Sequence, residues 1–399
     1  MYTEQDLVRV AKRENNNKRK YLVVNRLQGK HIPVKPHEAL VMFKALADTL
    51  KDRYANERLL LVGFAETATA IGAAVASELG AEYMQTTRES VAEAEYLYFS
   101  EEHSHASEQK LVKNDIDRVI GTIDRIIFIE DEVTTGKTIL NIISILKKQY
   151  SENIQFSAAS ILNGMDAEAL DAYQEHGIEL FWLVKTSHAA YTEIAESYKG
   201  DGRYFVCTQE SALTNPTVPK SIISLKQIKI NEMMNARRVV SSLEYKQFCE
   251  SLYQNISSRI DFEGIQKILV LGTEEFMYPA LYAADRFEAQ GRDVRFHATT
   301  RSPIAVSGEE GCPLHTRYEL KSLYDKRRTT FIYDLIKYDM VVIISDAQGD
   351  ITEGLDSLIR ALALCGNENI IFVGSQLRDC SEITCNRNPE AELLHECEQ

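Results

Sequence analysis

The stretch Phe128–Leu140, FIEDEVTTGKTIL, joins an apolar run to a helical pattern through a short polar loop. The run Arg125–Ile129 is typical of a buried strand, and the following apolar residues recur at the spacing of one helix face. These helix-face residues are Ile139, Leu140, Ile142, Ile143 and Leu146. A Walker P-loop would need a glycine where this chain has Asp131, so the Gly-Lys-Thr ending does not indicate a nucleoside triphosphate site. Instead, the pattern predicts a ligand loop at the carboxyl end of a parallel strand.

The same order of strand, glycine turn and helix occurs elsewhere in the chain. It appears in RLLLVGFAETATAIGAAVASELGAEYM (residues 58–84) and in KILVLGTEEFMYPALYAADRFEAQG (residues 267–291). A chain of 399 residues is too long for one ordinary core. The fold class is therefore predicted as α/β, with two Rossmann-like parallel-sheet domains.

The segment ALTNPTVPKS, with Pro216 and Pro219, interrupts the alternation of strands and helices. The predicted organisation is a first domain over residues 1–210, a linker and helix over 211–260, and a second domain over 261–399.

Composition narrows the class of protein further. A formal charge of −14 argues against nucleic-acid binding by general electrostatics. No apolar run approaches the ~20 residues of a membrane helix, and the polar N-terminus does not resemble a secretory signal. All seven cysteines lie after residue 200 without a CxxC pair, which argues against a zinc ribbon or a disulfide framework. We expect a soluble, cytoplasmic protein that contacts neither membrane nor nucleic acid.

The loop after Ile129 carries two kinds of group with complementary chemistry. Glu130 and Asp131 are acids of the type that accept hydrogen bonds from ribose hydroxyls. Thr134, Thr135, Gly136, Lys137 and Thr138 place small side chains and backbone N–H groups at a helix start, which suits one phosphate. Together they predict a site for ribose 5-phosphate. The alternative is that the acids only cap the helix and the threonines fill a tight turn.

Three further stretches carry candidate site residues. The loop after the first apolar strand, with Phe64, Ala65, Glu66 and Thr67, offers amides and hydroxyls to an anion, although small residues at a helix start often serve packing alone. Arg88 follows the next strand and could meet pyrophosphate as a fork of donors, or form a surface ion pair. Glu102, His103 and His105 stand in a charged loop and are candidates for metal, pyrophosphate or acceptor contacts, or for a solvated loop.

The segment FIEDEVTTGKT resembles the phosphoribosyl-pyrophosphate (PRPP) motif of type I phosphoribosyltransferases. The resemblance implies that Glu130 and Asp131 hold the ribose hydroxyls, that residues 134–138 wrap the 5-phosphate, and that Mg²⁺ enters with PRPP. It also implies that the loop over residues 64–67 with Arg88 binds pyrophosphate, while Glu102 and His103 close over the reacting centre. The hypoxanthine-guanine enzymes carry an aspartate where this chain has Thr134, which puts a purine acceptor in doubt.

The segment HATTRSPI (residues 297–304), together with the first-half motifs, is similar to two-domain proteins in which a TRSP domain follows a phosphoribosyltransferase domain. Such proteins occur in bacterial tellurite-resistance and stress operons. The resemblance implies an enzyme that uses PRPP to ribosylate an unidentified acceptor, and a homodimer is a further hypothesis. Two alternatives stay open: an enzyme like ribose-phosphate pyrophosphokinase, and a non-catalytic PRPP sensor.

The second half repeats several features of the first. LLLVGFAET and ILVLGTEEF are each followed by a helical pattern, a strand and the residues Thr-Thr-Arg. Further along, IIFIEDEVTTGKT in the first half corresponds to VVIISDAQGDITEG in the second. We infer that the second domain is a diverged copy that lacks the acid pair and the phosphate cradle, the alternative being a shared α/β pattern without common descent. Identical strand orders are expected if this is correct. A second pocket is predicted there from Thr273, Glu274, Glu275, Arg301 and Ser302, although packing and capping explain these residues nearly as well.

Overall fold

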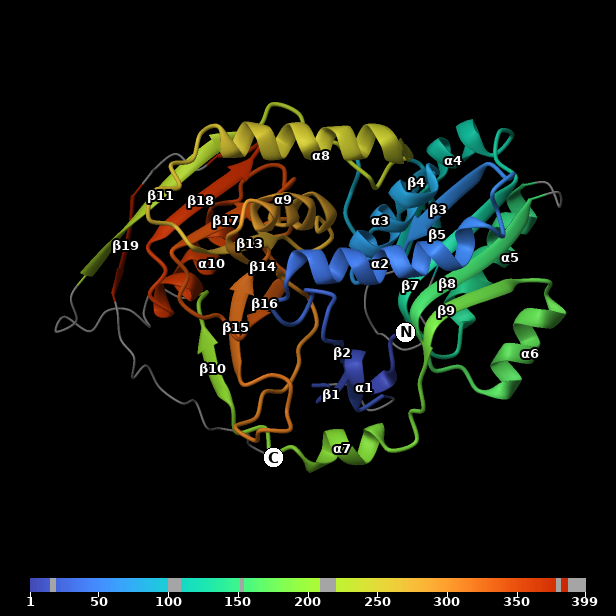
Figure 1. The fold of residues 1–399 in the computed structure, drawn as a ribbon, viewed down its shortest axis with the longest axis horizontal. Helices are drawn as coiled ribbons and strands as arrows, with labels where there is room; N and C mark the ends of the chain where they lie inside the picture. The colour runs from blue at the N-terminus through green and yellow to red at the C-terminus, as the bar shows by residue number, and fades with distance from the viewer. Residues whose placement is uncertain (15–18, 100–108, 151–153, 209–219, 378–381, 387–399) are drawn as a thin grey trace. The chain divides into compact units, whose positions relative to one another are not determined.

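A computed structural model describes residues 1–14, 19–99, 109–150, 154–208, 220–377 and 382–386 (Figure 1). The chain forms two compact units that do not follow its linear order. The first unit comprises Met1–Asp6, His37–Ala189 and Met234–Ser251, and the second comprises Leu7–Pro36, Ala190–Met233 and Leu252–Gln399.

The first unit is built on a six-stranded sheet. Its strands are, in spatial order, β12 (Val240–Ser241), β4 (Glu82–Gln85), β3 (Leu59–Gly63), β7 (Arg125–Val133), β8 (Gln155–Asn163) and β9 (Glu179–Lys185). All neighbours pair in parallel except β12, which runs antiparallel to β4. The chain moves from β3 to β4 on one side and then to β7 on the other. The carboxyl ends of β3 and β7 are therefore the topological switch point, where open sheets of this kind bind ligands.

Helices and a hairpin complete the first unit. They are α1 (Glu4–Leu7), α2 (Pro36–Lys51), α3 (Thr69–Leu79), α4 (Lys113–Val119), α5 (Lys137–Gln149), α6 (Ala167–Glu175) and the antiparallel pair β5 (Tyr96–Phe99) and β6 (Gln109–Val112). The apolar face predicted for α5 is confirmed at Ile139, Ile142, Ile143 and Leu146, which are all buried. Burial of this face fixes the N-terminus of α5 beside the end of β7.

The second unit has its own six-stranded sheet. The spatial order is β14 (Asp293–Ala298), β13 (Lys267–Gly272), β17 (Met340–Ile344), β18 (Asn369–Gly374), β11 (Lys220–Lys229) and β19 (Glu382–Asn386), and only β19 is antiparallel. Further elements are β1 (Val8–Lys12), β2 (Tyr21–Asn25), α7 (Tyr191–Ser197), β10 (Arg203–Val206), α9 (Tyr278–Ala289), β15 (Thr316–Lys321), β16 (Thr329–Tyr333) and α10 (Thr352–Leu364). The helix α8 (Ser242–Ser257) is divided between the two units.

The two sheets share one strand order. The order β4–β3–β7–β8 in the first unit corresponds to β14–β13–β17–β18 in the second, with every pair parallel. Each unit also inserts an antiparallel hairpin before its third core strand, β5–β6 in one and β15–β16 in the other. The predicted α/β class with two parallel-sheet domains is confirmed. The strand orders also meet the expectation set by the hypothesis of a diverged copy.

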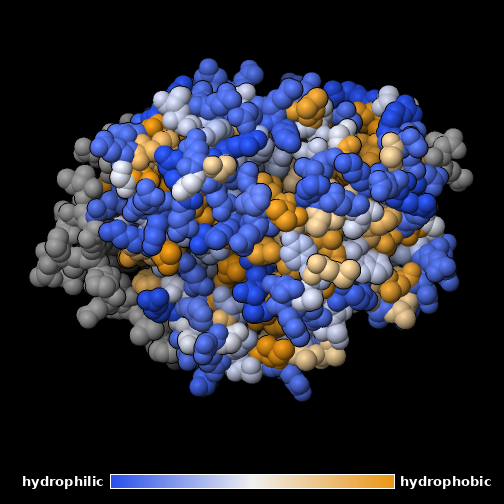
Figure 2. Space-filling view, viewed as in Figure 1, coloured by the Kyte–Doolittle hydropathy of each residue, from blue (hydrophilic) through white to orange (hydrophobic). Residues whose placement is uncertain are grey.

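The viewed surface is mainly hydrophilic, with small apolar areas between polar ones (Figure 2). In the part of the chain that the structure describes, no helix combines the length and apolarity needed to cross a membrane. Four described cysteines, Cys207, Cys249, Cys312 and Cys365, are free thiols.

Candidate functional site

The acid pair lies in the part of β7 that extends beyond the end of β3. Pairing between β3 and β7 ends at Gly63 and Ile129, whereas β7 continues along β8 as far as Val133. Glu130 and Asp131 therefore belong to strand β7, which continues through Glu132 to Val133 before the loop begins. Because β3 has already turned away, one side of β7 is open at these half-buried acids.

The loop between β3 and α3 faces the same point. Thr67 donates a hydrogen bond from its hydroxyl to Asp131 Oδ1 at 2.8 Å. This contact joins a residue predicted for pyrophosphate to one predicted for ribose. Glycine is required at the turn, because a Cβ on Gly63 would lie 2.8 Å from the Tyr83 hydroxyl and 2.9 Å from the Ala68 carbonyl oxygen.

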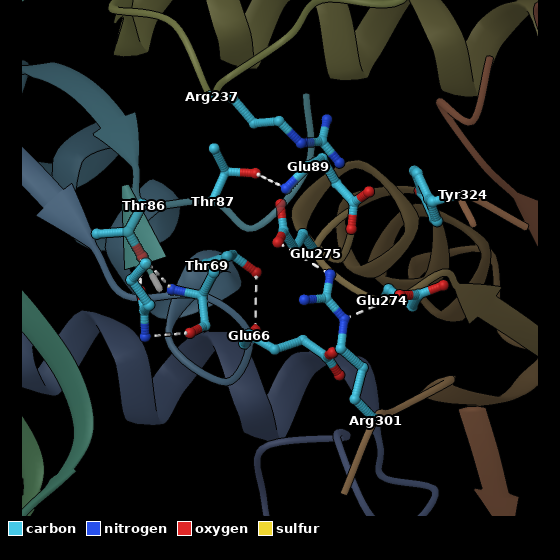
Figure 3. Close-up of polar contacts among 12 residues, drawn as sticks. Glu66, Thr69, Thr86, Thr87, Glu89, Arg237, Glu274, Glu275, Arg301 and Tyr324 are labelled. Atoms are coloured by element: carbon cyan, nitrogen blue, oxygen red, sulfur yellow. Dashed lines mark hydrogen bonds and ion pairs between the residues drawn. The ribbon is translucent and has the colours of Figure 1, made fainter. Parts of the chain in front are cut away.

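The first part of this loop is held internally. Phe64 donates its N–H to Ile129 O at 3.0 Å, and its ring packs in the core against Phe128. Ala65 donates its N–H to Thr86 Oγ1 at 2.8 Å and accepts from Gln109 Nε2 at 3.0 Å. In Figure 3 Thr69 reaches back to the carbonyl of Glu66, at 3.3 Å. The amides of Phe64 and Ala65 thus shape the loop and are committed to other acceptors.

The predicted phosphate cradle forms the entry to α5. Thr134 and Thr135 lie in the turn, Gly136 is the N-cap with φ +70°, and α5 starts at Lys137. Gly136 supplies no side-chain cap to this helix, and the Lys137 N–H donates to Thr135 Oγ1 at 3.4 Å. The first turn of α5 is the positive end of the helix dipole. Thr138 follows inside the first turn.

Tyr173 fixes the left-handed residue at this turn. Its hydroxyl donates to Gly136 O at 2.7 Å, and a Cβ on Gly136 would approach its ring to 2.5 Å. Burial and the nearby Glu130 carboxylate raise the pKa of Tyr173, so the phenol stays a donor. The cradle is therefore built around a glycine that no other residue can replace without moving Tyr173.

The remaining predicted residues of the first unit are placed as follows. Arg88 follows the bridge between Thr87 and Lys110, at the carboxyl end of β4. Glu102 and His103 lie outside the described residues, as does His105. The structure thus brings Thr67, Asp131 and the α5 turn to one edge of the sheet.

A second group of polar residues lies at the carboxyl ends of β7, β8 and β9. The sequence analysis did not predict this group. His188 Nε2 lies 3.3 Å from Glu132 Oε1 and 2.9 Å from the Thr186 hydroxyl, and the side chains of His188 and Glu132 are largely buried. A Cβ on Gly164 would overlap the His188 ring at 2.2 Å, so the glycine makes room for the imidazole. The only sequence signal was Glu132, a third acid in the quoted motif.

Asn163 contributes an oriented amide to this edge. Its Oδ1 accepts from Lys185 Nζ at 2.8 Å and from the Met165 N–H at 3.0 Å, which fixes the side-chain amide orientation. Its Nδ2 is fully buried and has no hydrogen-bond partner among the described residues. Such an orphaned donor suits an oxygen or ring nitrogen of a ligand or water.

The pKa of Asp131 is raised, so its carboxylate takes up a proton at mildly acidic pH. Burial, and then the neighbouring Glu132 carboxylate, raise the pKa of Asp131 to about 6, although the Thr67 hydrogen bond opposes this. Ribose hydroxyls donated to this carboxylate would favour its ionised form.

The residues predicted in the second unit form an ion cluster. Arg301 donates to Glu274 Oε2 at 2.9 Å and to Glu275 Oε1 at 3.0 Å (Figure 3). Thr273 contacts the hydroxyls of Ser345, at 2.9 Å, and Tyr324, at 2.8 Å. Ser302 is held by backbone contacts, since its N–H donates to Thr300 Oγ1 and its carbonyl accepts from Tyr333.

Comparison with known proteins gives two family matches along the chain. Residues 7–193 match the model of a family described as phosphoribosyl transferase, and residues 238–362 match the TRSP domain that lies C-terminal to it. The chain belongs to the phosphoribosyltransferase–TRSP family. It is thus a phosphoribosyltransferase by family, with the acid pair and the α5 turn inside the first match. A search of the curated proteins found no significant match.

Solved structures similar to this chain include three adenine phosphoribosyltransferases. The enzyme of Leishmania tarentolae is 16% identical with a TM-score of 0.34, over 47% of this chain and 88% of its own. That of Rhodothermus marinus is 13% identical with a TM-score of 0.34, over 46% and 96%. That of Giardia lamblia, complexed with 9-deazaadenine, is 17% identical with a TM-score of 0.33, over 46% and 96%. Identities and TM-scores this low say nothing of the acceptor that this chain uses.

Proposed function

We propose that the first unit transfers the phosphoribosyl group of PRPP to a small-molecule acceptor in a Mg²⁺-dependent reaction. The observation that carries the proposal is that Thr67, Asp131 and the start of α5, whose N-cap is a glycine, lie together at the switch point. One edge thereby offers acids for sugar hydroxyls and N–H groups for a phosphate.

In this proposal the residues act by positioning and by charge. Glu130 and Asp131 accept the ribose hydroxyls, and the first turn of α5 with residues 134–138 binds the 5-phosphate. Thr67 orients Asp131, while Arg88 and the loop of residues 64–67 face the departing pyrophosphate, with Glu66 and Thr67 as the loop residues whose amides are offered to it. Carboxylate oxygens at this edge suit Mg²⁺, which would neutralise charge on the pyrophosphate oxygens.

The reaction joins an acceptor atom to the anomeric carbon as the bond to pyrophosphate breaks. Positive charge builds on the ribose, so fixed acids nearby and exclusion of water favour transfer over hydrolysis. Glu102 and His103 remain proposed closing residues, and the nucleoside-like product, the tellurite-resistance and stress context, the cytoplasmic location and the homodimer are parts of the same proposal.

Calorimetric titration with PRPP and Mg²⁺ tests the proposal, beside the Glu130→Gln/Asp131→Asn variant. The exposed Asp52→Asn is a matched control, since it also removes a carboxylate from the same unit. We expect binding in the wild type and control that the double variant loses, followed by pyrophosphate release when acceptors are screened. Equal binding by the double variant would refute the assignment of the acids.

A further inference from the structure

The register of the two sheets gives a residue-by-residue equivalence between the units. Gly63 pairs with Ile129 in the first, and Gly272 pairs with Ile344 in the second. Counting onward from these pairs, Asp346 stands at the position of Asp131. In the same way, the loop residue Glu274 stands at the position of Ala65, and Glu275 at that of Glu66.

Backbone contacts support the equivalence independently. Thr86 donates its N–H to Gly63 O at 3.0 Å, and Thr299 donates to Gly272 O at 3.2 Å. The hydroxyls of the same two threonines accept the N–H groups of Ala65, at 2.8 Å, and Glu274, at 3.0 Å. The next residue in each strand then bridges its hairpin, as Thr87 with Lys110 and Thr300 with Phe331. Arg301 is therefore the counterpart of Arg88.

The loop side chains differ at three positions, since Phe64, Ala65 and Thr67 correspond to Thr273, Glu274 and Phe276, but only the second position changes the charge. Where the first unit has the methyl group of Ala65, the second has the Glu274 carboxylate, which is 1% exposed. Its Oε2 accepts from Arg301 at 2.9 Å and from Arg328 at 2.8 Å, and its Oε1 accepts from the Ser322 hydroxyl. Three donors thus converge on one anionic group.

Such a group of donors is what a phosphate oxygen requires, because two guanidinium forks and a hydroxyl supply charge-assisted hydrogen bonds. Glu275, also buried, adds a second carboxylate on Arg301 at 3.0 Å. The loop before α10 is acidic as well, with Asp350 held by Lys326 at 2.7 Å where the first unit has its threonine cradle. Acids thus occupy the places that a diphosphate and a 5-phosphate would need.

We propose that the second unit is a phosphoribosyltransferase-fold copy in which the carboxylate of Glu274 takes the place of a bound diphosphate. The wild-type second unit therefore binds no diphosphate, and removal of the Glu274 carboxylate opens a diphosphate site at Arg301, Arg328 and Ser322. The proposal rests on the proposed function in one respect, the number of pyrophosphate sites expected in the first unit.

The test is calorimetric titration with inorganic pyrophosphate and Mg²⁺ of the full chain. Glu274→Ala should bind one more pyrophosphate per chain than the wild type, and Glu274→Ala/Arg301→Gln should lose that extra site. Pyrophosphate should also raise the melting temperature of Glu274→Ala more than that of the double variant. Circular dichroism checks that both variants are folded.

A folded Glu274→Ala with no additional site would overturn the proposal. So would pyrophosphate binding by the wild type that Arg301→Gln removes and Arg88→Gln does not, a measurement that stands even where Glu274→Ala does not fold. If the wild type binds none and Glu274→Ala binds one, the proposed first-unit site fails while the present inference stands.

Discussion

Gly136→Ala tests whether the entry to α5 is built as described. The alanine must adopt φ +70°, which costs about 1–2 kcal/mol for a residue with a Cβ. Its Cβ would also lie 2.5 Å from the Tyr173 ring, and relief of such overpacking costs about 1–3 kcal/mol more. We therefore expect a loss of about 2–5 kcal/mol in the free energy of unfolding of the first unit.

Gly80→Ala is the matched control, since Gly80 has φ +66° and nothing lies within 4 Å of the added Cβ. It should lose only the conformational part, about 1–2 kcal/mol. Trp182, the sole tryptophan, lies in β9 of the first unit, so its fluorescence during urea unfolding reports on that unit. If both alanine variants lose the same stability, the close packing of Gly136 on Tyr173 is wrong.

Four further predictions concern Asp131 and its neighbours Thr67 and Glu132. PRPP affinity should fall as the pH drops through about 6, because protonated Asp131 no longer accepts ribose hydroxyls, and calorimetry at pH 5–8 would expose a flat profile if this is wrong. Without ligand the sign reverses: the folded protein holds this proton more tightly than the unfolded chain, so stability should fall as pH rises from about 4 to about 6, and urea unfolding of Asp131→Asn should lack that fall. Thr67→Val should weaken PRPP binding about 5–10-fold by removing one hydrogen bond to the acid, whereas Thr67→Ser should bind as the wild type does. Glu132→Gln removes a like charge and should lower the pH midpoint of PRPP binding; an unchanged midpoint would assign the shift to burial alone.

The sequence was sufficient where the chemistry is local. The acid pair, the helix start and the apolar face of α5 lie within one short stretch, so spacing alone predicted their order. The exact place of the acids was harder. Whether Glu130 belongs to a strand or to a loop depends on β8, which pairs with β7 beyond the end of β3. Such pairing is non-local and leaves no mark in the motif itself.

The residues that the sequence analysis missed also depend on non-local contacts. His188 meets Glu132 only because β7, β8 and β9 are consecutive neighbours in the sheet. Likewise, Lys30 is fully buried and donates to the carbonyls of Glu274 and Thr299, both at 2.8 Å. A lysine near the N-terminus thus holds the ion-cluster loop of the second unit. Neither contact has a periodicity or a spacing that a sequence pattern can detect.

The two units show that this fold does not by itself define a substrate. The backbone contacts that shape the loop after Gly63 recur after Gly272, within a few tenths of an ångström. With the geometry kept, the change from Ala65 to Glu274 places a charged group in the centre of the loop. Burying that carboxylate requires partners, which Arg301 and Arg328 supply, and this leaves the arginines neutralised. The loop of the first unit has only a methyl group at this position, so the same frame carries no charge there.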